Sequence, residues 1–387
     1  MIKRELSKKI KGYLKSFPIV TITGPRQSGK TTLLKHLFPK RTYVSLEDPD
    51  KRAFAEEDPK RFLATFPAPV IFDEIQKVPR LFSYLQTLTD EIGKNGMYVL
   101  SGSQNFLLME KISQSLAGRV GILSLLPFGF EELKNSKIVF GNNLDSVLFT
   151  GFYPRIWDKK LNAFDWYINY VQTYLERDVR QIKNVNNLRL FQRFLRLCAG
   201  RTGQILSLSS FANDCGISHN TANSWLSILE ASYIIYLLPP YRKNFNKRLI
   251  KSPKLYFYDT GLACSLLGIE NKRQLITHPL RGSLFETFVI SELVKNRFNR
   301  GKIMNLSYFR DKSGHEIDCL IEEGGKIKAV EIKSGQTISS NFFKNLSYWQ
   351  NLSKTDPKNS FVVYGGNEGQ KRSLGTVVGW EKLGGLF

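Results

Sequence analysis

Gly24-Pro25-Arg26-Gln27-Ser28-Gly29-Lys30-Thr31 has the spacing of a phosphate-binding loop, Gly-x-x-x-x-Gly-Lys-Thr, between an apolar run at 19–22 and a helical segment at 31–38. Glycines let backbone N–H groups surround a phosphate, the lysine neutralises phosphate oxygens, and the threonine hydroxyl ligates magnesium. The stretch therefore predicts an ATP and Mg²⁺ site in which Lys30 is catalytic and Thr31 is a metal ligand. The expected nucleotide-binding residues are Gly24, Pro25, Arg26, Gln27, Ser28, Gly29, Lys30, Thr31 and Thr32.

A second apolar run, Pro69-Val70-Ile71-Phe72, ends in the paired carboxylates Asp73 and Glu74. Such a pair is the expected magnesium partner of a phosphate-binding loop. We expect Asp73 to hold the metal through water and Glu74 to orient and deprotonate the attacking water. The alternative interpretation is a solvated turn that happens to carry two acidic residues.

Polar residues also follow the apolar run at 97–100, where a side chain can bridge the γ-phosphate and the attacking water. Ser103 and Gln104 are the two candidates, and the sequence does not choose between them. Arg119 is a candidate transition-state arginine, acting in its own chain or from a neighbouring subunit. The alternative is an arginine that pairs with a carboxylate at the rim of the domain.

Four short apolar runs, at 19–22, 42–46, 69–72 and 97–100, are separated by segments long enough for crossover helices. This spacing predicts an α/β fold with a mainly parallel sheet of the RecA/AAA-like P-loop type.

The chain of 387 residues carries 56 Lys and Arg against 34 Asp and Glu, a net charge of +22. Its length favours two or three domains, and its charge favours a polyanionic partner, above all DNA. The alternative is a solvated basic face that meets only nucleotide phosphates. Four scattered cysteines and the lack of a long apolar run predict a soluble, cytoplasmic protein without disulfides or membrane contact. Residues 1–15 are expected to form a basic amphipathic helix.

Residues 211–229 have the spacing of a helix-turn-helix, in which Gly216 supplies the turn and Ser218 caps the second helix. Its inward stripe is expected to be Ala222, Trp225, Leu226 and Leu229, and its outward face His219, Asn220, Asn223 and Ser224.

The segment from Tyr241 to Lys254 follows with six basic residues and no acidic one, as in the basic wing of a winged helix. Such a cluster would contact phosphates. Many winged helices dock only proteins, so a protein partner stays open as an alternative.

Near the C-terminus, Asp318 lies in one apolar strand, and Glu331 and Lys333 lie on one face of the next. A hairpin of the two strands would let Asp318 and Glu331 share a divalent metal, with Glu286 adding a third carboxylate. Lys333 would then activate water or stabilise developing negative charge. The alternatives are exposed charges on a strand face, or a nuclease-like lobe that binds without cutting.

Together these motifs resemble a prokaryotic family of AAA-type ATPases whose C-terminal half is a domain of unknown function. The resemblance also includes residues 72–79, 115–119, 174–178 and 258–261. The set Glu286, Asp318 and Glu331-x-Lys333 is similar to the PD-(D/E)xK nuclease core. The resemblance implies an ATPase domain at 1–155, a helical linker or lid at 156–203, a winged-helix domain at 204–268 and an α/β nuclease-like domain at 269–387.

The resulting functional prediction is an ATPase coupled to DNA binding and to metal-dependent DNA cleavage, in a chain that can form homo-oligomers. Two alternatives remain: a DNA-binding ATPase switch with an inactive nuclease-like lobe, and a regulatory ATPase whose winged helix binds a protein.

Overall fold

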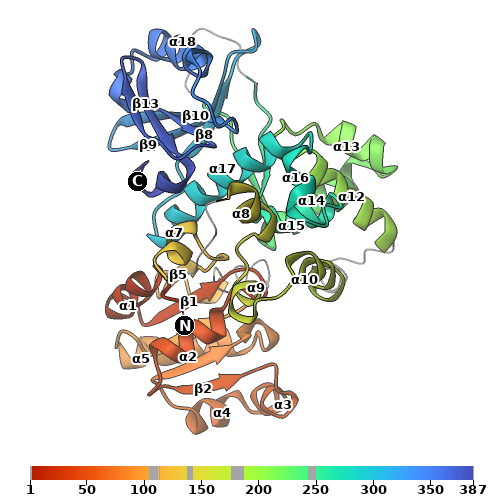
Figure 1. Cartoon of the computed structure of the whole chain (residues 1–387). Coiled ribbons are helices and arrows are strands. Elements are labelled where there is room, and N and C mark those ends of the chain that lie inside the picture. Colours follow the sequence, from red (N-terminus) through yellow and green to blue (C-terminus); the bar gives the residue numbers. More distant parts are fainter. Residues whose placement is uncertain are drawn as a thin grey trace.

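The computed structural model describes residues 2–103, 112, 114–136, 143–175, 187–242 and 250–386, with the backbone alone at 174 and 175. In Figure 1 an N-terminal sheet lies at the bottom, a C-terminal sheet at the top, and a group of helices on the right. Nowhere in these ranges is a helix both long enough and apolar enough to span a membrane. All four cysteines are buried and free of disulfides.

The N-terminal sheet has five parallel strands in the order β2-β3-β4-β1-β5. All five residues of β1 are buried, as expected for a central strand covered by helices on both faces. The parallel sheet and four of its strands were predicted from the apolar runs. The strands are β1 (Ile19–Thr23), β2 (Thr42–Ser45), β3 (Val70–Asp73), β4 (Tyr98–Ser101) and β5 (Val120–Ser124).

Helices that begin at recognisable caps connect these strands. Asp48 and Asp58 cap α3 and α4 with their side chains, and a proline occupies the first turn of each helix. The predicted N-terminal helix is α1, which is anchored by buried Leu6 and Ile10. The helices are α1 (Ser7–Ser16), α2 (Lys30–Leu37), α3 (Pro49–Glu57), α4 (Pro59–Thr65), the 3₁₀ turn η1 (Ile75–Lys77) and α5 (Leu81–Ile92).

A set of short helices then leads away from the first sheet. Asp259, which is 2% exposed, fastens this segment to the middle of the chain. It accepts hydrogen bonds from the Phe152 N–H (2.7 Å), the Tyr167 hydroxyl (2.6 Å) and the Leu262 N–H (3.0 Å). The helices are α7 (Phe130–Lys134), α8 (Leu144–Thr150), α9 (Pro154–Lys159), α10 (Ala163–Tyr170) and the π-helix η2 (Val171–Leu175).

The middle of the chain contains the predicted helix-turn-helix geometry. Gly216 has φ +72° between α13 and α14, and Ser218 Oγ accepts the Thr221 N–H at 3.1 Å, as expected for turn and cap. The predicted inward stripe of α14 is buried, and His219, Asn220 and Asn223 are exposed. The elements are α12 (Leu188–Gly200), α13 (Leu208–Cys215), α14 (His219–Ala231), β6 (Ile235–Leu238), β7 (Lys254–Phe257), α15 (Thr260–Leu266) and α16 (Lys272–Ile276).

α12 packs on the helix-turn-helix, because the Phe194 ring contacts Phe211 and Trp225. β6 and β7 form an antiparallel pair, and Ile205 adds an antiparallel bridge to Lys254 at the start of β7.

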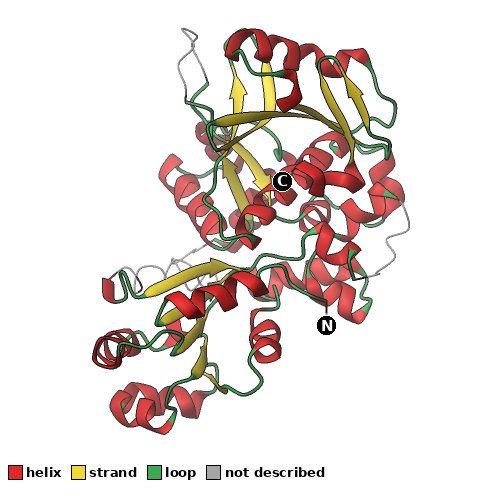
Figure 2. Ribbon diagram, turned by 90° about the vertical axis from the view of Figure 1, so that its left-hand side faces the viewer, coloured by secondary structure: helices red, strands yellow, loops and turns green. Residues whose placement is uncertain are grey.

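The C-terminal sheet has six strands in the order β12-β13-β11-β10-β9-β8. Figure 2 shows this sheet at the top of the molecule, away from the N-terminal sheet. The predicted hairpin of β9 and β10 is antiparallel, whereas β10, β11 and β13 are parallel. α17 is buried almost all around, because it contacts β5, β7 and β10 and so touches every part of the chain. The elements are α17 (Arg281–Asn299), β8 (Leu306–Arg310), β9 (Glu316–Glu323), β10 (Lys326–Lys333), η3 (Ser340–Phe343), α18 (Lys344–Ser353), η4 (Pro357–Asn359), β11 (Ser360–Tyr364), β12 (Gln370–Arg372), β13 (Gly375–Gly379) and η5 (Trp380–Leu386).

Candidate nucleotide site and C-terminal carboxylate cluster

The loop between β1 and α2 is shaped for an anion. At Gly24, with φ +140°, a Cβ would lie 2.1 Å from the Leu125 carbonyl oxygen, so a side chain cannot be accommodated there. Gly29, with φ +91°, is the N-cap of α2 and offers no side-chain cap. The first N–H groups of α2 therefore point into the loop without a side-chain acceptor, which suits a phosphate.

Two cations hold this loop in place. Lys30 Nζ donates to the carbonyls of Gly24 (3.0 Å) and Pro25 (2.9 Å). Arg4, only 4% exposed, donates to the carbonyls of Ser28 (2.9 Å) and Leu126 (2.6 Å). Its guanidinium also pairs with buried Glu132 at 3.1 Å. Arg4 thus stabilises the loop by hydrogen-bonding it to the segment after β5, a role that the sequence did not indicate.

The Asp73 carboxylate is the centre of the predicted magnesium site. Its Oδ2 accepts hydrogen bonds from Thr31 Oγ1 (2.8 Å) and the Tyr43 hydroxyl (2.6 Å), and its Oδ1 accepts one from Ser101 Oγ. Burial and the hydrogen bond to Asp73 raise the pKa of the Tyr43 hydroxyl, so it stays a donor. Thr31 and Asp73 bring two hard oxygen ligands together, a donor set that fits Mg²⁺. A magnesium ion held there would neutralise phosphate charge.

Glu74 lies beside this pair in a strained backbone conformation, with φ +56°. Its Oε2 accepts hydrogen bonds from Ser103 Oγ (2.9 Å) and Gln76 Nε2 (2.5 Å), which orient the carboxylate. The structure thus brings the predicted candidates Glu74 and Ser103 together. Gln104 lies outside the described residues.

A cleft of about 580 Å³ joins these groups, and Lys30, Thr31, Thr32, Glu74 and Ser103 all line it. The opposite wall belongs to α9, which contributes residues that the sequence reasoning missed. They are Pro154, Arg155, Asp158 and Lys159. Arg155 and Lys159 lie one turn apart on α9, and Lys159 pairs with Asp158 at 3.5 Å. The residues of α9 lie more than 120 positions along the chain from the loop at 24–31, so only the fold brings the two together.

Arg119 lies far from this cleft. β1 and β5 are parallel with Ile19 opposite Val120, so Arg119 stands at the amino end of the sheet and the loop stands at its carboxyl end. The guanidinium pairs with Asp90 in two places, Nε–Oδ1 at 2.5 Å and Nη2–Oδ2 at 2.8 Å. The expectation of an arginine acting on the nucleotide of its own chain is therefore wrong. The ion pair with Asp90 is the alternative that the sequence had left open for Arg119. A role of Arg119 at the nucleotide of a neighbouring subunit stays a prediction.

Comparison with known protein families agrees with this geometry. Residues 16–134 match an AAA domain. The N-terminal part of the chain is an AAA-type ATPase domain. Residues 141–273 and 281–383 of the same ATPase match two domains of unknown function, DUF8612 and DUF4143.

Two curated relatives match most of the chain. An uncharacterized protein of Mycobacterium tuberculosis is 29% identical over 342 residues, which cover 87% of this chain and 75% of the relative. An uncharacterized protein of Methanocaldococcus jannaschii is 24% identical over 401 residues, which cover 89% of this chain and 81% of the relative. Among solved structures, a Walker-type ATPase of Pyrococcus abyssi has a TM-score of 0.47 at 16% identity, covering 69% of this chain and 96% of that one. DnaA of Aquifex aeolicus bound to AMPPCP has a TM-score of 0.30 at 13% identity. The match covers 58% of this chain and 85% of the DnaA chain.

The C-terminal residues that the sequence predicted to bind metal do lie together, with Glu316 as a fourth carboxylate. We refer to Glu286, Glu316, Asp318 and Glu331 as the carboxylate cluster. Lys333 Nζ lies 2.7 Å from Glu331 Oε2 and 3.9 Å from Asp318 Oδ2. Burial and the nearby Asp318 charge raise the pKa of Glu286 to about 7, against the opposing effect of Lys254.

The cluster does not fit a divalent metal. Lys254, 3% exposed, inserts its ammonium among the carboxylates, at 2.5 Å from Glu316 Oε1 and 3.0 Å from Glu286 Oε1. Within the ranges that the structure describes, no group of three His, Cys, Asp or Glu side chains is arranged to hold a metal ion. Lys254 was expected on the basic wing and is instead buried. The wing residues 243–249 and the acidic part of the motif at 174–178 lie outside the described residues.

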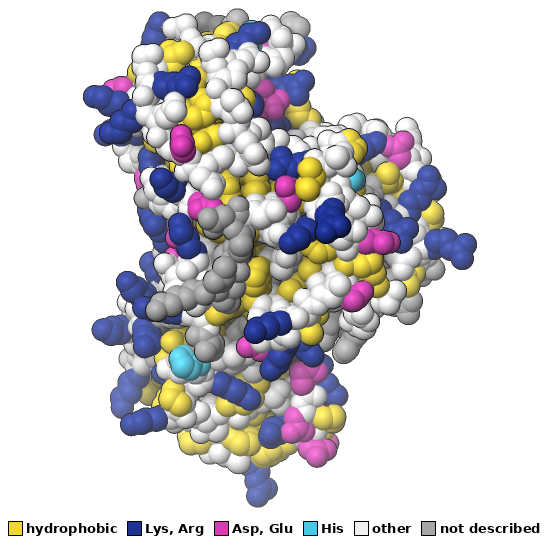
Figure 3. Space-filling model, viewed as in Figure 1, with side chains coloured by type: hydrophobic (Ala, Val, Ile, Leu, Met, Phe, Trp, Pro, Cys, Tyr) yellow, Lys and Arg dark blue, Asp and Glu magenta, His cyan; other side chains and the backbone are white. Residues whose placement is uncertain are grey.

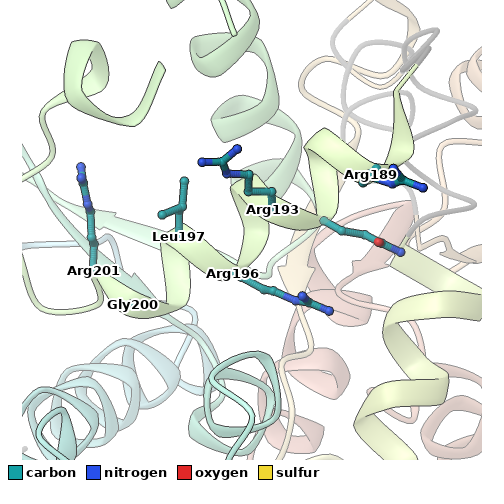
Figure 4. A pocket seen from close by; sticks show the side chains of 7 residues that line it. Arg189, Arg193, Arg196, Leu197, Gly200 and Arg201 are labelled. Atoms are coloured by element: carbon teal, nitrogen blue, oxygen red, sulfur yellow. The ribbon is translucent and has the colours of Figure 1, made fainter. Parts of the chain in front are cut away.

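A row of arginines marks the outer face of α12. Arg189, Arg193 and Arg196 are exposed and project from successive turns beside a hollow of about 540 Å³ (Figure 4). No ion pair of these three side chains is found within the described part of the chain. Arg201, at the end of the row, pairs with Asp214 of α13. The sequence analysis had not singled out this row.

We predict that Arg155→Ala lowers kcat/KM for ATP about 10–100-fold, because it removes a cation from the wall that faces the phosphate loop. Steady-state phosphate release measures the effect. Arg80→Ala is the matched control, since Arg80 is exposed in the same domain and does not line the cleft. Equal rates for both variants and wild type would contradict a phosphate-facing role for Arg155.

Proposed function

We propose that this AAA-type ATPase is a DNA-binding switch, in which ATP binding and hydrolysis change how its middle and C-terminal parts engage DNA. The ATPase half of the proposal rests on the cleft lined by Lys30, Thr31 and Glu74, with Asp73 hydrogen-bonded to Thr31. Nucleotide phosphates would meet the α2 N–H groups and Lys30, while Glu74 would accept the proton of the attacking water. Ser103 would keep the Glu74 carboxylate directed at that water.

The DNA-binding half rests first on the middle of the chain, which we assign as a winged helix. The order α12, Ile205 bridge, α13, α14, β6 and β7 supports this assignment, because it combines three helices with a two-stranded antiparallel sheet that one isolated bridge extends. The exposed side chains of His219, Asn220 and Asn223 then lie on the helix that would enter the major groove.

Positive charge adds a second line of support. The chain has a net charge of +22, and Lys and Arg side chains are spread over the face seen in Figure 3, with a gathering over α1. The three exposed arginines of α12 lie on the helix that packs against the helix-turn-helix. A surface of this kind suits the phosphate backbone of DNA, because each neutralised phosphate releases counterions.

The observation that carries the coupling is the Tyr233 hydroxyl. Tyr233 follows α14, and its hydroxyl lies 2.8 Å from Thr23 Oγ1 and 2.8 Å from Ser124 Oγ. Thr23 is the residue directly before the phosphate loop. The three mutually hydrogen-bonded hydroxyls of Tyr233, Thr23 and Ser124 therefore join the segment that follows α14 to the nucleotide site. Such a contiguous contact is a physical route by which nucleotide state can bias the middle of the chain.

We further propose the nuclease-like assignment for the C-terminal part, supported by its mixed sheet with α17 and α18 packed against it. The domain limits at 155, 203 and 268 remain predictions, and the packing of α12 on α13 favours counting α12 with the winged helix. A homo-oligomer and a cytoplasmic location are also proposals. The Lys254 ion pairs favour the switch with an inactive nuclease-like lobe over the DNA-cutting enzyme.

Glu74→Gln is expected to abolish ATP hydrolysis, by about 100-fold or more, while leaving ATP affinity within a factor of about three. The amide keeps the shape of the side chain but cannot accept a proton. Phosphate release and fluorescent-nucleotide titration measure the two quantities. Normal hydrolysis by this variant would show that Glu74 is not the base.

Replacing Arg189, Arg193 and Arg196 by Gln is expected to weaken duplex DNA binding about 10-fold or more and to reduce the salt slope of log K by about two to three. Fluorescence anisotropy over a salt series measures both. The control variant replaces Arg61, Arg80 and Arg273 by Gln. These three arginines are exposed elsewhere on the chain, so the control removes the same number of positive charges. If wild type shows no salt-dependent DNA binding, the regulatory ATPase with a protein partner takes the place of this proposal.

Tyr233→Phe is expected to keep basal ATP hydrolysis within about a factor of two, since the hydrogen bond between Thr23 and Ser124 at 3.0 Å remains and only about 1 kcal/mol of stability is lost. The ratio of ATPase rates with and without DNA should move toward one. Tyr236→Phe is the control, because the buried Tyr236 hydroxyl has no hydrogen-bond partner in the described chain. An unchanged ratio in Tyr233→Phe would rule out this route.

A further inference from the structure

Lys254 brings a positive charge to the place where the C-terminal lobe gathers its negative charges. It is the first residue of β7, and its side chain is 3% exposed. Its ammonium lies 2.5 Å from Glu316 Oε1, 3.0 Å from Glu286 Oε1 and 3.9 Å from Asp318 Oδ1. One cation from the middle of the chain therefore contacts three of the four members of the carboxylate cluster.

The remaining charges are also met by side chains of the protein. Lys333 pairs with Glu331, and Arg310 pairs with Glu316 Oε2 at 2.9 Å. Four carboxylates thus face three cations. Donors satisfy further oxygens, since the Tyr256 hydroxyl reaches Glu286 Oε1 at 2.5 Å and the Ile332 N–H reaches Asp318 Oδ2 at 2.7 Å.

A divalent ion would need the same oxygens at about 2.0–2.6 Å. Lys254 lies between Glu286 and Asp318, and Lys333 lies between Glu331 and Asp318, so both approaches to Asp318 already hold an ammonium. Two like charges at such short range repel strongly in a poorly hydrated site. One oxygen, Glu331 Oε1, is buried without a hydrogen-bond partner among the described residues. The Lys333 ammonium meets the other oxygen, Glu331 Oε2.

We propose that Lys254 is a built-in cation that takes the place of a divalent metal in the carboxylate cluster and thereby binds β7 of the middle segment to the C-terminal lobe. The cluster is then an ion-pair site between two parts of the chain and not a metal centre. Once the ammonium is removed, Glu286, Asp318 and Glu331 lose this counter-charge and can rearrange around a divalent cation. This inference does not involve the nucleotide site, so it stands or falls separately from the ATPase.

The test titrates Mn²⁺ into the full-length protein without nucleotide, by calorimetry and by thermal unfolding. Wild type is expected to show no binding at the cluster and no Mn²⁺-dependent rise in Tm. Lys254→Met is expected to unfold at a lower temperature, to gain one Mn²⁺ per chain, and to recover stability as Mn²⁺ is added. At about 100 times Kd the metal shifts the folding equilibrium about 100-fold.

Lys295→Met is the matched control. Lys295 is 1% exposed and pairs with Glu292 at 2.9 Å on α17, so the variant also loses a buried cation but leaves the cluster intact. It should be destabilised without rescue by Mn²⁺. Adding Asp318→Asn to Lys254→Met should abolish the gained Mn²⁺ binding.

Binding of one Mn²⁺ by the wild-type protein, lost in Glu331→Gln, would overturn the proposal. Mn²⁺-dependent cutting of supercoiled plasmid by wild type, lost in the same variant, would do so as well. Both measurements use wild type as the reference, so they decide the question even if Lys254→Met does not fold.

Discussion

The Asp73 carboxylate holds together the end of the N-terminal sheet on which the nucleotide site is built. It accepts hydrogen bonds from Thr31 after β1, from Tyr43 on β2 and from Ser101 on β4, while it belongs to β3 itself. The carboxyl ends of three neighbouring strands and the start of α2 are thus fastened by one carboxylate. A buried carboxylate is tolerated only when donors surround it, and here one of the donors, Thr31, is also a predicted magnesium ligand.

The same constraint acts in the C-terminal lobe and leads to a different outcome. Its carboxylates are satisfied by ammonium groups, one of them Lys254 from a distant strand, which leaves little room for a metal. The two acidic sites of this protein therefore differ in what balances their charge. In the first, the partners are neutral hydroxyls that bring no positive charge, whereas in the second the cations are part of the chain.

Local sequence patterns predicted a large share of this architecture. The loop at 24–31, four strands of the first sheet, the Gly216 turn, the Ser218 cap and the β9–β10 hairpin all follow from spacing over a few residues, because backbone preference and periodicity act locally. The patterns failed where partners are far apart. For Arg119 the sequence left a nucleotide role and a rim ion pair both open, and the parallel register of β1 and β5 places it at the other end of the sheet, where it pairs with Asp90.

By itself the sequence determined which chemistry the chain carries: a phosphate loop, a paired Asp73 and Glu74, a capped helix-turn-helix and a set of C-terminal acidic residues. The tertiary structure alone decided what each charge meets. It placed Arg155 at the cleft beside the phosphate loop, buried Lys254 among carboxylates and hydrogen-bonded Tyr233 to Thr23. The physical reason is that electrostatic and hydrogen-bond energies depend on distance and burial in space, which separation along the chain does not set.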